Sequence, residues 1–194
     1  PLPINKITLE DIYGKKFKTE NEVRNFLDSI RNTDINPLNT DQLFEATVGN
    51  KLADIFFRPY TRKMWGIDPK ELAVSIGARL PVRTNNDSRY FNDDFQALPK
   101  DGYTSMVKKM LDHKNIEISL NTPFEKGMEK KYEHSFLSVP IDEYYNFKFG
   151  YLPYRSIIFE PRLEDGPDLE APVINFTDDY KYTRKTQWNL FPNS

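Results

Sequence analysis

The 194-residue chain contains no cysteine, which excludes disulfide bonds, thiolate nucleophiles and cysteine-ligated metals. Its only histidines, His113 and His134, are too few and too isolated for a zinc site or a catalytic triad. GxGxxG, P-loop and HExxH patterns are absent. No apolar run approaches the roughly 20 residues that cross a bilayer, and the first residues do not read as a signal peptide. We therefore expect no metal and no membrane insertion, and the lack of cysteine fits a cytoplasmic protein.

Charge is nearly balanced, with 27 basic and 29 acidic residues and a net charge of -2. A chain with this balance has no overall field that would gather nucleic acid or an anionic membrane. The unusual feature is the aromatic content of 14%. Aromatic rings pack cores, and Tyr and Trp also stack on bases and sugars, so composition alone leaves both roles open.

The two ends suggest an excised piece. Pro1 stands where an initiator methionine would be, and Ser194 follows no helix or strand signal. We interpret the chain as a segment of a longer protein.

The first third of the sequence predicts helices. Thr19 and Glu22 match a capping box, and the apolar residues between Val23 and Ile30 follow at i, i+3, i+4 and i+7. A second helical stretch is predicted from about 41 to 63, weakened or divided at Gly49. A third, short helix is predicted to start at Asp68-Pro69 and to run through 75.

From residue 79 onward the pattern favours antiparallel strands. The strongest candidates are segments rich in aromatic and β-branched residues, at 89–95, 154–161, 172–177 and 181–186. Weaker predictions are a helix at 104–111, strands at 116–120 and 135–139, and a helix near 141–147. The fold class is α+β, an N-terminal helical bundle portion followed by a mostly antiparallel β-sheet. We divide the chain into a helical domain, 1–78, and a sheet domain, 79–194, with an inserted segment at about 101–147.

Residues 56–66 combine aromatic side chains with three cations. One interpretation is a helix end packed on the core, with the cations near its C-terminal dipole. The other is an aromatic shelf for a flat ligand, flanked by charges for the ligand's anionic part. Trp65, just before Gly66 and a capped helix, would then lie on a mobile loop.

Several arginines stand beside apolar or tyrosine residues, at Arg79, Arg83, Arg155 and Arg184. Each is either an ion-pair partner or an anion ligand. Guanidinium presents a planar fork that binds phosphate through two parallel hydrogen bonds, so several arginines on one sheet would suit a diphosphate.

The order of these motifs resembles the bacterial UDP-galactopyranose mutases. The matching stretches are Phe56-Phe57-x-x-Tyr60-Thr61-x-x-x-Trp65-Gly66-x-Asp68-Pro69, Arg79-Leu80-Pro81-Val82-Arg83, Tyr90-Phe91-Asn92-Asp93, Gly102-Tyr103-Thr104, Pro140-Ile141-Asp142-x-Tyr144, Tyr154-Arg155-Ser156, Asn175-Phe176-Thr177-Asp178 and Tyr182-Thr183-Arg184. No single stretch is decisive, and their specificity comes from their order and spacing.

The resemblance implies a flavin-dependent isomerase that interconverts UDP-galactopyranose and UDP-galactofuranose, a precursor for cell-surface polysaccharides such as lipopolysaccharide. In that family the nucleophile is N5 of reduced FAD, held on a Rossmann-type domain. The Gly-rich flavin motif and the C-terminal flavin segment are not in this sequence. We therefore expect no catalytic residue in this chain, no retained FAD and no activity of the chain alone.

The resemblance also implies roles for residues on the uridine side. Tyr60 resembles the tyrosine that stacks on uracil, with Phe56, Phe57 and Thr61 lining the same pocket. Trp65 resembles the tryptophan of a mobile loop that closes over the uridine. Pro59 departs from the glycine common in the family (in this sequence it directly precedes Tyr60), and it stiffens the chain there.

Further residues resemble those that hold the nucleotide and the diphosphate. Asn175 matches a nucleotide-contacting asparagine, and Arg79 and Arg184 match the two arginines that bind the diphosphate. Tyr90 resembles a tyrosine that hydrogen-bonds a phosphate. Arg155 lies in a family motif, and either a ligand contact or a structural ion pair fits it.

Other classes of function remain open at this point. The alternative is a non-catalytic module that binds a nucleotide sugar or a protein, and a third interpretation is a single-stranded nucleic-acid binder, against which the net acidity argues. The expected small-molecule partner is UDP-galactose. By the resemblance, residues 101–147 would lie against the flavin domain that is absent from this sequence, so their apolar surface would be exposed. An exposed edge at 116–120 would then invite pairing with a second copy of the chain.

Overall fold

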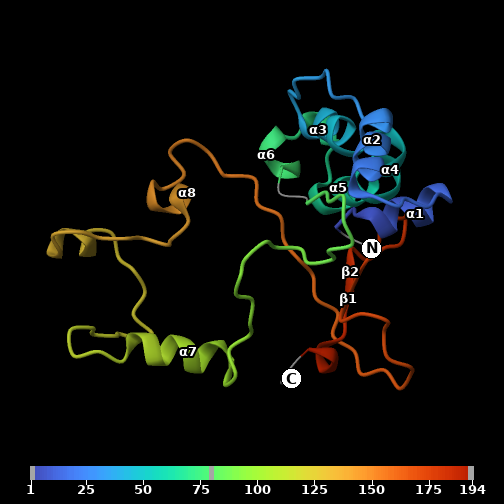
Figure 1. The fold of residues 1–194 in the computed structure, drawn as a ribbon. Helices are drawn as coiled ribbons and strands as arrows, with labels where there is room; N and C mark the ends of the chain where they lie inside the picture. Colours follow the sequence, from blue (N-terminus) through green and yellow to red (C-terminus); the bar gives the residue numbers. More distant parts are fainter. Residues whose placement is uncertain (1–2, 79–80, 192–194) are drawn as a thin grey trace. The chain divides into compact units, whose positions relative to one another are not determined.

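A computed structural model describes residues 3–78 and 81–191 of the chain (Figure 1). The chain forms two compact units: one combines Pro1–Ala97 with Asp165–Ser194, and the other is Leu98–Glu164. The described helices and strands are, in chain order, α1 (Lys6–Tyr13), α2 (Glu20–Ile30), α3 (Thr40–Val48), α4 (Asn50–Leu52), the π-helix η1 (Ala53–Phe57), α5 (Arg58–Trp65), the 3-10 helix η2 (Pro69–Glu71), α6 (Val74–Gly77), α7 (Gly102–Leu111), the 3-10 helix η3 (Met128–Lys131), α8 (Ile141–Tyr144), β1 (Val173–Asn175), β2 (Arg184–Thr186) and the 3-10 helix η4 (Trp188–Leu190). Helices precede strands, which confirms the predicted α+β class.

The first unit begins with two capped helices. Asn5 caps α1 by accepting from the Thr8 backbone N–H, and Gly14 ends it at a φ of 63°. The first third of the sequence predicts helices without delimiting this one, although asparagine is among the residues preferred at a helix N-cap. The predicted cap of α2 is confirmed, because the Thr19 hydroxyl accepts from the Glu22 N–H. The Glu22 carboxylate accepts from the N–H of Lys18, one residue earlier than in the standard capping box.

The helical stretch from 40 to 65 is divided at Gly49, as predicted. Gly49 has a φ of 78° and a ψ of 165°, a conformation that only glycine adopts without strain. A Cβ atom there would lie 2.1 Å from the carbonyl oxygen of Ile30, so the glycine also allows α2 to approach closely. These features pin the end of α3 against the end of α2.

The π-helix η1 precedes a proline. The Arg58 N–H donates to the Ala53 carbonyl, five residues back, and Pro59 has no N–H to continue the normal pattern. The chain returns to α-helical hydrogen bonding in α5, and Gly66 ends that helix at a φ of 68°.

The expected helix from 68 through 75 is wrong in its extent. Asp68 does cap a helical turn, accepting from the Lys70 N–H, but that turn ends at Glu71 and α6 starts separately at Val74. The intervening carbonyls of Leu72 and Ala73 instead accept hydrogen bonds from the backbone and hydroxyl of Thr40. Binding to α3 therefore draws the chain out of helical conformation.

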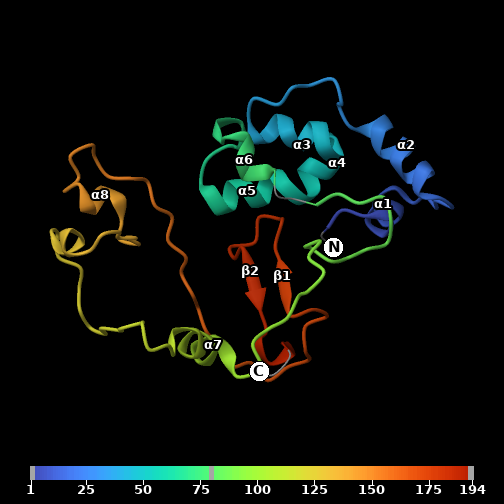
Figure 2. The same ribbon diagram turned by 60° about the vertical axis from the view of Figure 1, so that its left-hand side comes forward.

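One hydrophobic core lies in the first unit. Its buried members come from the N-terminal segment, from α1, α2, α3, α4 and η1, and from the connection between α1 and α2, and they are Ile4, Leu9, Phe17, Val23, Phe44, Val48, Leu52, Ala53 and Phe57. Helices α3, α4, α5 and α6 lie together in both ribbon views (Figures 1 and 2). The backbone of Ile4 also forms a parallel bridge with Val82, which ties the segment after α6 to the N-terminal part.

The described sheet is a two-stranded antiparallel hairpin. β1 and β2 pair as Val173 with Thr186, Ile174 with Lys185, and Asn175 with Arg184. This confirms strands within 172–177 and 181–186. The strands predicted at 89–95, 116–120, 135–139 and 154–161 are wrong, since none of these segments is assigned as a strand. A strand requires a partner backbone, and aromatic and β-branched composition does not supply one.

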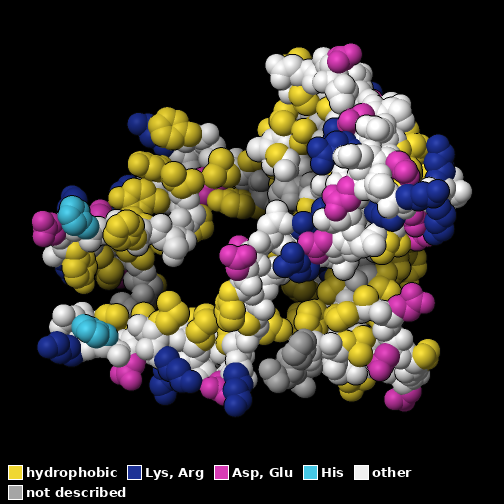
Figure 3. All heavy atoms as spheres, in the orientation of Figure 1, with side chains coloured by type: hydrophobic (Ala, Val, Ile, Leu, Met, Phe, Trp, Pro, Cys, Tyr) yellow, Lys and Arg dark blue, Asp and Glu magenta, His cyan; other side chains and the backbone are white. Residues whose placement is uncertain are grey.

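The second unit, Leu98–Glu164, has α7, η3 and α8 joined by long irregular stretches. Its large apolar side chains are mostly exposed, as predicted for 101–147; the extremes include Phe136 at 100% and Ile158 at 86%. Figure 3 shows these side chains gathered over α7 and α8. Within the described part of this unit, Asp142 is the buried polar residue.

No helix among the described residues combines the length and the apolar character that a membrane span needs.

Candidate functional site

A buried arginine fixes the start of α5, the helix that carries most of the predicted uridine-side residues. Arg58 is about 9% exposed. Its guanidinium donates to Asp41 at 2.5 Å, to Glu45 and Asn50 at 2.9 Å each, and to Asp54 at 3.0 Å. Burial alone would lower the pKa of Arg58, but the hydrogen bonds to Asp41 and Asp54 outweigh it and raise the pKa above the ordinary arginine value. The cation therefore joins α3, α4 and η1 to α5.

The two phenylalanines before Arg58 differ in environment. Phe57 is about 4% exposed and stacks on Phe44 with 5.2 Å between ring centroids, so it is part of the core. Phe56 is half-buried and packs against the edge of the core.

Along α5, Thr61 is buried, while Tyr60 and Trp65 are half-buried. Trp65 is the last residue of α5, and the loop that was expected to carry it begins at Gly66.

On the hairpin, two predicted ligand residues meet directly. Asn175 and Arg184 are cross-strand partners, and the Arg184 Nε–H donates to Asn175 Oδ1 at 2.9 Å. Both side chains are exposed. This bond uses Nε, and within the described part of the chain no hydrogen bond from the two terminal nitrogens of the guanidinium is seen. The amide thus orients the arginine and leaves its terminal donors facing solvent.

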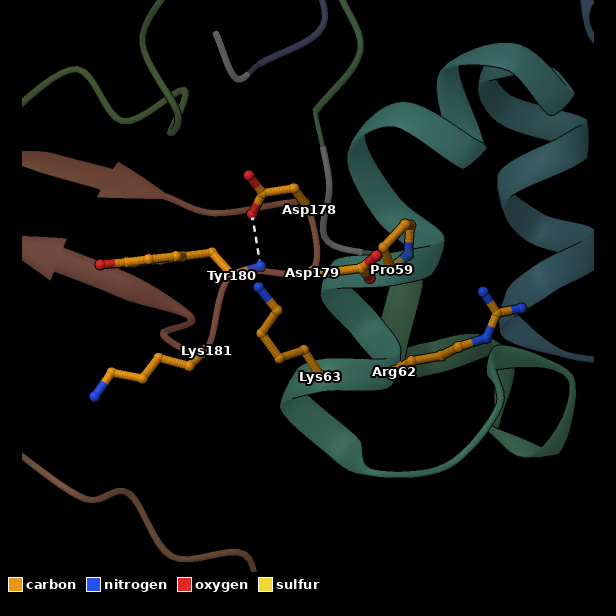
Figure 4. A pocket seen from close by; sticks show the side chains of 7 residues that line it. All are labelled: Pro59, Arg62, Lys63, Asp178, Asp179, Tyr180 and Lys181. Carbon is orange, nitrogen blue, oxygen red and sulfur yellow. Dashed lines mark hydrogen bonds between the residues drawn. The ribbon is translucent and has the colours of Figure 1, made fainter.

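A lysine of α5 contacts the same hairpin. Lys63 Nζ donates to the carbonyls of Phe176 at 3.1 Å and Tyr182 at 3.2 Å, just beyond the paired strands. Figure 4 shows the Lys63 side chain extending from α5 toward the hairpin tip. Around the tip, Tyr180 packs against Phe176 and Tyr182, with centroids 4.7 and 5.5 Å apart.

A pocket of about 470 Å³ lies between α5 and the hairpin tip (Figure 4). It is lined by Pro59, Arg62, Lys63, Asp178, Asp179, Tyr180 and Lys181. None of the predicted site residues lines it, although Pro59 directly precedes Tyr60. The Arg62 guanidinium points away from the hairpin tip, and its Nε–H donates to the Asp68 carboxylate at 2.9 Å (Figure 4). This pocket was not anticipated from the sequence.

Tyr90 follows a loop held by charged side chains. The Arg83 backbone N–H donates to the Ile4 carbonyl at 2.8 Å, and the Arg83 guanidinium donates to the Arg89 carbonyl at 2.7 Å. Hydrogen bonds from the Arg89 side chain and backbone lower the pKa of Asp87 well below its usual range. Tyr90 itself is exposed beyond this loop.

Arg79, predicted to be the second diphosphate ligand, lies outside the described residues. Its role is therefore an expectation from the sequence.

In the second unit, two stretches that carry the family resemblance meet at Asp142. Its carboxylate accepts from the Leu152 N–H at 3.0 Å and from the Tyr154 hydroxyl at 3.1 Å. The Leu152 hydrogen bond is the main cause that lowers the pKa of Asp142. Burial, and then the contact with Asp142, raise the pKa of Tyr154. Arg155 follows Tyr154 and is exposed, and no described carboxylate pairs with it.

Within the described ranges, no group of three or more His, Cys, Asp or Glu side chains is arranged to hold a metal ion.

Comparisons with known proteins find relatives of the chain that are mutases of nucleotide-linked sugars. It is 37% identical over 98% of its length to a probable UDP-galactopyranose mutase of Klebsiella pneumoniae and covers 50% of that protein. It is 35% identical over 98% of its length to a dTDP-fucopyranose mutase of Escherichia coli, of which it covers 52%. A UDP-galactopyranose mutase of Mycoplasma pneumoniae is 31% identical over 71% of the chain and is covered to 39%.

The family profile described as UDP-galactopyranose mutase matches residues 55–194. The chain belongs to the UDP-galactopyranose mutase family. It spans about half the length of the curated relatives it matches.

Proposed function

We propose that this chain is the substrate-holding portion of a flavin-dependent mutase that interconverts UDP-galactopyranose and UDP-galactofuranose. Its role is to bind the UDP part of the substrate. Family membership supports the reaction class. The observation that carries the binding role is the pair of Asn175 and Arg184, in which an amide orients a guanidinium and leaves its terminal donors available to an anion.

In this proposal α5 and the hairpin supply the two ends of one nucleotide site. Tyr60 stacks on the base, and Trp65 covers the uridine. Phe56 and Thr61 line the base pocket; Phe57 supports it from the core, where it stacks on Phe44.

Arg184 binds the diphosphate, and Asn175 contacts the nucleotide. Tyr90 hydrogen-bonds a phosphate, and Arg79 supplies a second guanidinium. Two guanidinium groups suit a diphosphate because each can form parallel hydrogen bonds to phosphate oxygens.

The described residues do not fit a flavin site. FAD-binding Rossmann domains use a parallel sheet with a Gly-rich turn, whereas the described sheet is one antiparallel hairpin and the sequence has no such turn. We therefore assign reduced FAD to the remainder of a longer parent protein, and we propose that the chain alone is inactive. The same proposal divides the chain into a helical domain, 1–78, and a sheet domain, 79–194, with an inserted segment at about 101–147. It also includes a cytoplasmic location.

A second candidate substrate is a dTDP-linked sugar. The identity to the dTDP-fucopyranose mutase, 35%, is nearly that to the probable UDP-galactopyranose mutase, 37%. Both nucleotides present a pyrimidine and a diphosphate, so the proposed contacts suit either. Base and sugar preference therefore need direct measurement.

A titration with uridine, UDP and dTDP tests the binding role. The chain has two tryptophans, so Trp188→Phe leaves Trp65 as the single tryptophan, which can be excited selectively over tyrosine. We expect UDP to quench Trp65. Arg184→Ala should weaken UDP binding by about tenfold or more, as expected for loss of a charge-assisted hydrogen bond, while leaving uridine binding unchanged. No response to either diphosphate would refute the proposal and favour a protein-interaction module.

The absorbance spectrum of the purified chain tests the assignment of FAD. A flavin band at ~450 nm with one flavin per chain would contradict the assignment of FAD to the rest of the parent.

A further inference from the structure

Lys63 is the residue of α5 whose side chain reaches the backbone of the β1–β2 hairpin. Its ammonium donates to the carbonyls of Phe176 and Tyr182, which lie 113 and 119 positions away in the sequence. Both acceptors are backbone atoms, so the contact fixes the course of the chain at this point rather than the rotamer of one side chain.

These two carbonyls stand where the hairpin ladder ends. Asn175 pairs with Arg184 as the last assigned pair, and the Phe176 N–H donates to the Thr183 carbonyl at 3.0 Å immediately beyond it. The lysine therefore binds the hairpin directly next to the Asn175–Arg184 pair.

On its own helix, Lys63 lies in sequence between the two aromatic site residues, Tyr60 and Trp65. Tyr60 lies three positions before it, which makes the two residues neighbours on the helix surface. Trp65 lies two positions after it, at the end of the same helix. One half-buried ammonium group thus links the helix that carries the aromatic residues to the hairpin that carries the guanidinium.

We propose that Lys63 is a positioning residue: it holds the hairpin against α5 so that Arg184 and Asn175 stay in register with Tyr60. The part of this inference that concerns the nucleotide rests on the proposed function. Lys63 itself need not touch the ligand, because two of the three donors of its ammonium are already used by protein carbonyls.

The first experiment measures hydrogen exchange in the 194-residue chain. Lys63→Met keeps an unbranched side chain and removes the ammonium. Lys18→Met removes the same charge from an exposed position next to α2 and serves as the matched control. We expect amides of residues 176–183 to exchange about tenfold faster in Lys63→Met, with α2 amides unchanged, because the lost bonds release the hairpin locally. Unchanged exchange at 176–183, or equally faster exchange in α2, would overturn the proposal.

The second experiment is a double-mutant cycle on UDP affinity with Lys63→Met and Arg184→Ala. We expect Lys63→Met alone to weaken UDP binding by about tenfold and to weaken it clearly less once Arg184 is replaced, because the lysine acts mainly through that residue and otherwise through Asn175. Independent, additive losses would overturn the positioning role.

The two experiments separate two kinds of failure. A chain that binds no UDP refutes the proposed function, while the exchange comparison still decides whether Lys63 holds the hairpin.

Discussion

Arg184 and Asn175 face each other across the hairpin, with the arginine Nε–H 2.9 Å from the asparagine amide oxygen. A lysine at position 184 would keep the positive charge but lose the planar fork that allows one bond to the amide and others to a phosphate. We expect Arg184→Lys to weaken UDP binding nearly as much as Arg184→Ala does. Calorimetric titration of the two variants checks this, and a Lys variant with wild-type affinity would show that charge alone matters.

Arg58 is the buried cation that joins α5 to its neighbours. Arg58→Met would leave Asp41, a carboxylate of about 4% exposure, without its partner. Removing one member of a buried ion pair typically costs about 3–5 kcal/mol, so we expect a loss of that size in the free energy of unfolding. Urea denaturation provides the measurement. Arg62→Met, at the exposed pair with Asp68, is the control and should cost no more than about 1 kcal/mol.

Gly49 tests the close approach of α2 and α3. Gly49→Ala places a methyl group 2.1 Å from the Ile30 carbonyl oxygen, in a backbone conformation that already costs a non-glycine residue about 1–3 kcal/mol. Gly14→Ala is the matched control, because its φ is 63° but no atom beyond its chain neighbours lies within 4 Å of the new Cβ. We expect thermal melts to show clearly greater destabilisation at 49 than at 14. Equal effects would mean that α2 moves away at little cost.

The carboxylate of Asp142 makes the second unit sensitive to acid. Its pKa is lowered in the folded chain below the ordinary 3.8, chiefly by the Leu152 N–H. A lowered carboxyl pKa means that the stabilisation is present above the unfolded value and is lost as the pH falls through the lower folded value. We expect the amide of Leu152 to lose protection below about pH 4, after correction for the intrinsic pH dependence of exchange. Asp142→Asn should remove this pH dependence, and a transition that persists in that variant would point to another group.

The sequence predicts correctly those local features that depend on residues only a few positions apart. The Thr19 cap, the division at Gly49 and the Asp68 cap all follow from residue type and immediate neighbours. The end of the turn after Asp68 was not predictable in the same way, because Thr40, some thirty positions earlier, takes the carbonyl of Ala73.

In the candidate site, too, the residue types are predictable from the sequence, whereas their long-range contacts are not. Asn175 and Arg184 were singled out by the resemblance, yet their pairing depends on a register that only the folded hairpin defines. In the sequence, Lys63 is simply one of the three cations that stand among the aromatic residues of 56–66. Its acceptors are backbone carbonyls more than a hundred residues away, and carbonyls carry no signature in a sequence. Pairing with a second copy through 116–120 stays a prediction, now without the strand on which it was based.

The π-helix η1 has a consequence for how this segment tolerates change in length. One extra residue within a turn rotates everything after it by about 100° around the helix axis. Arg58 faces its carboxylates, and Lys63 faces the carbonyls of the hairpin, only with that rotation included. Deleting one residue between 53 and 57 would therefore turn the whole of α5 away from its partners at once, a larger disturbance than any single substitution on its surface.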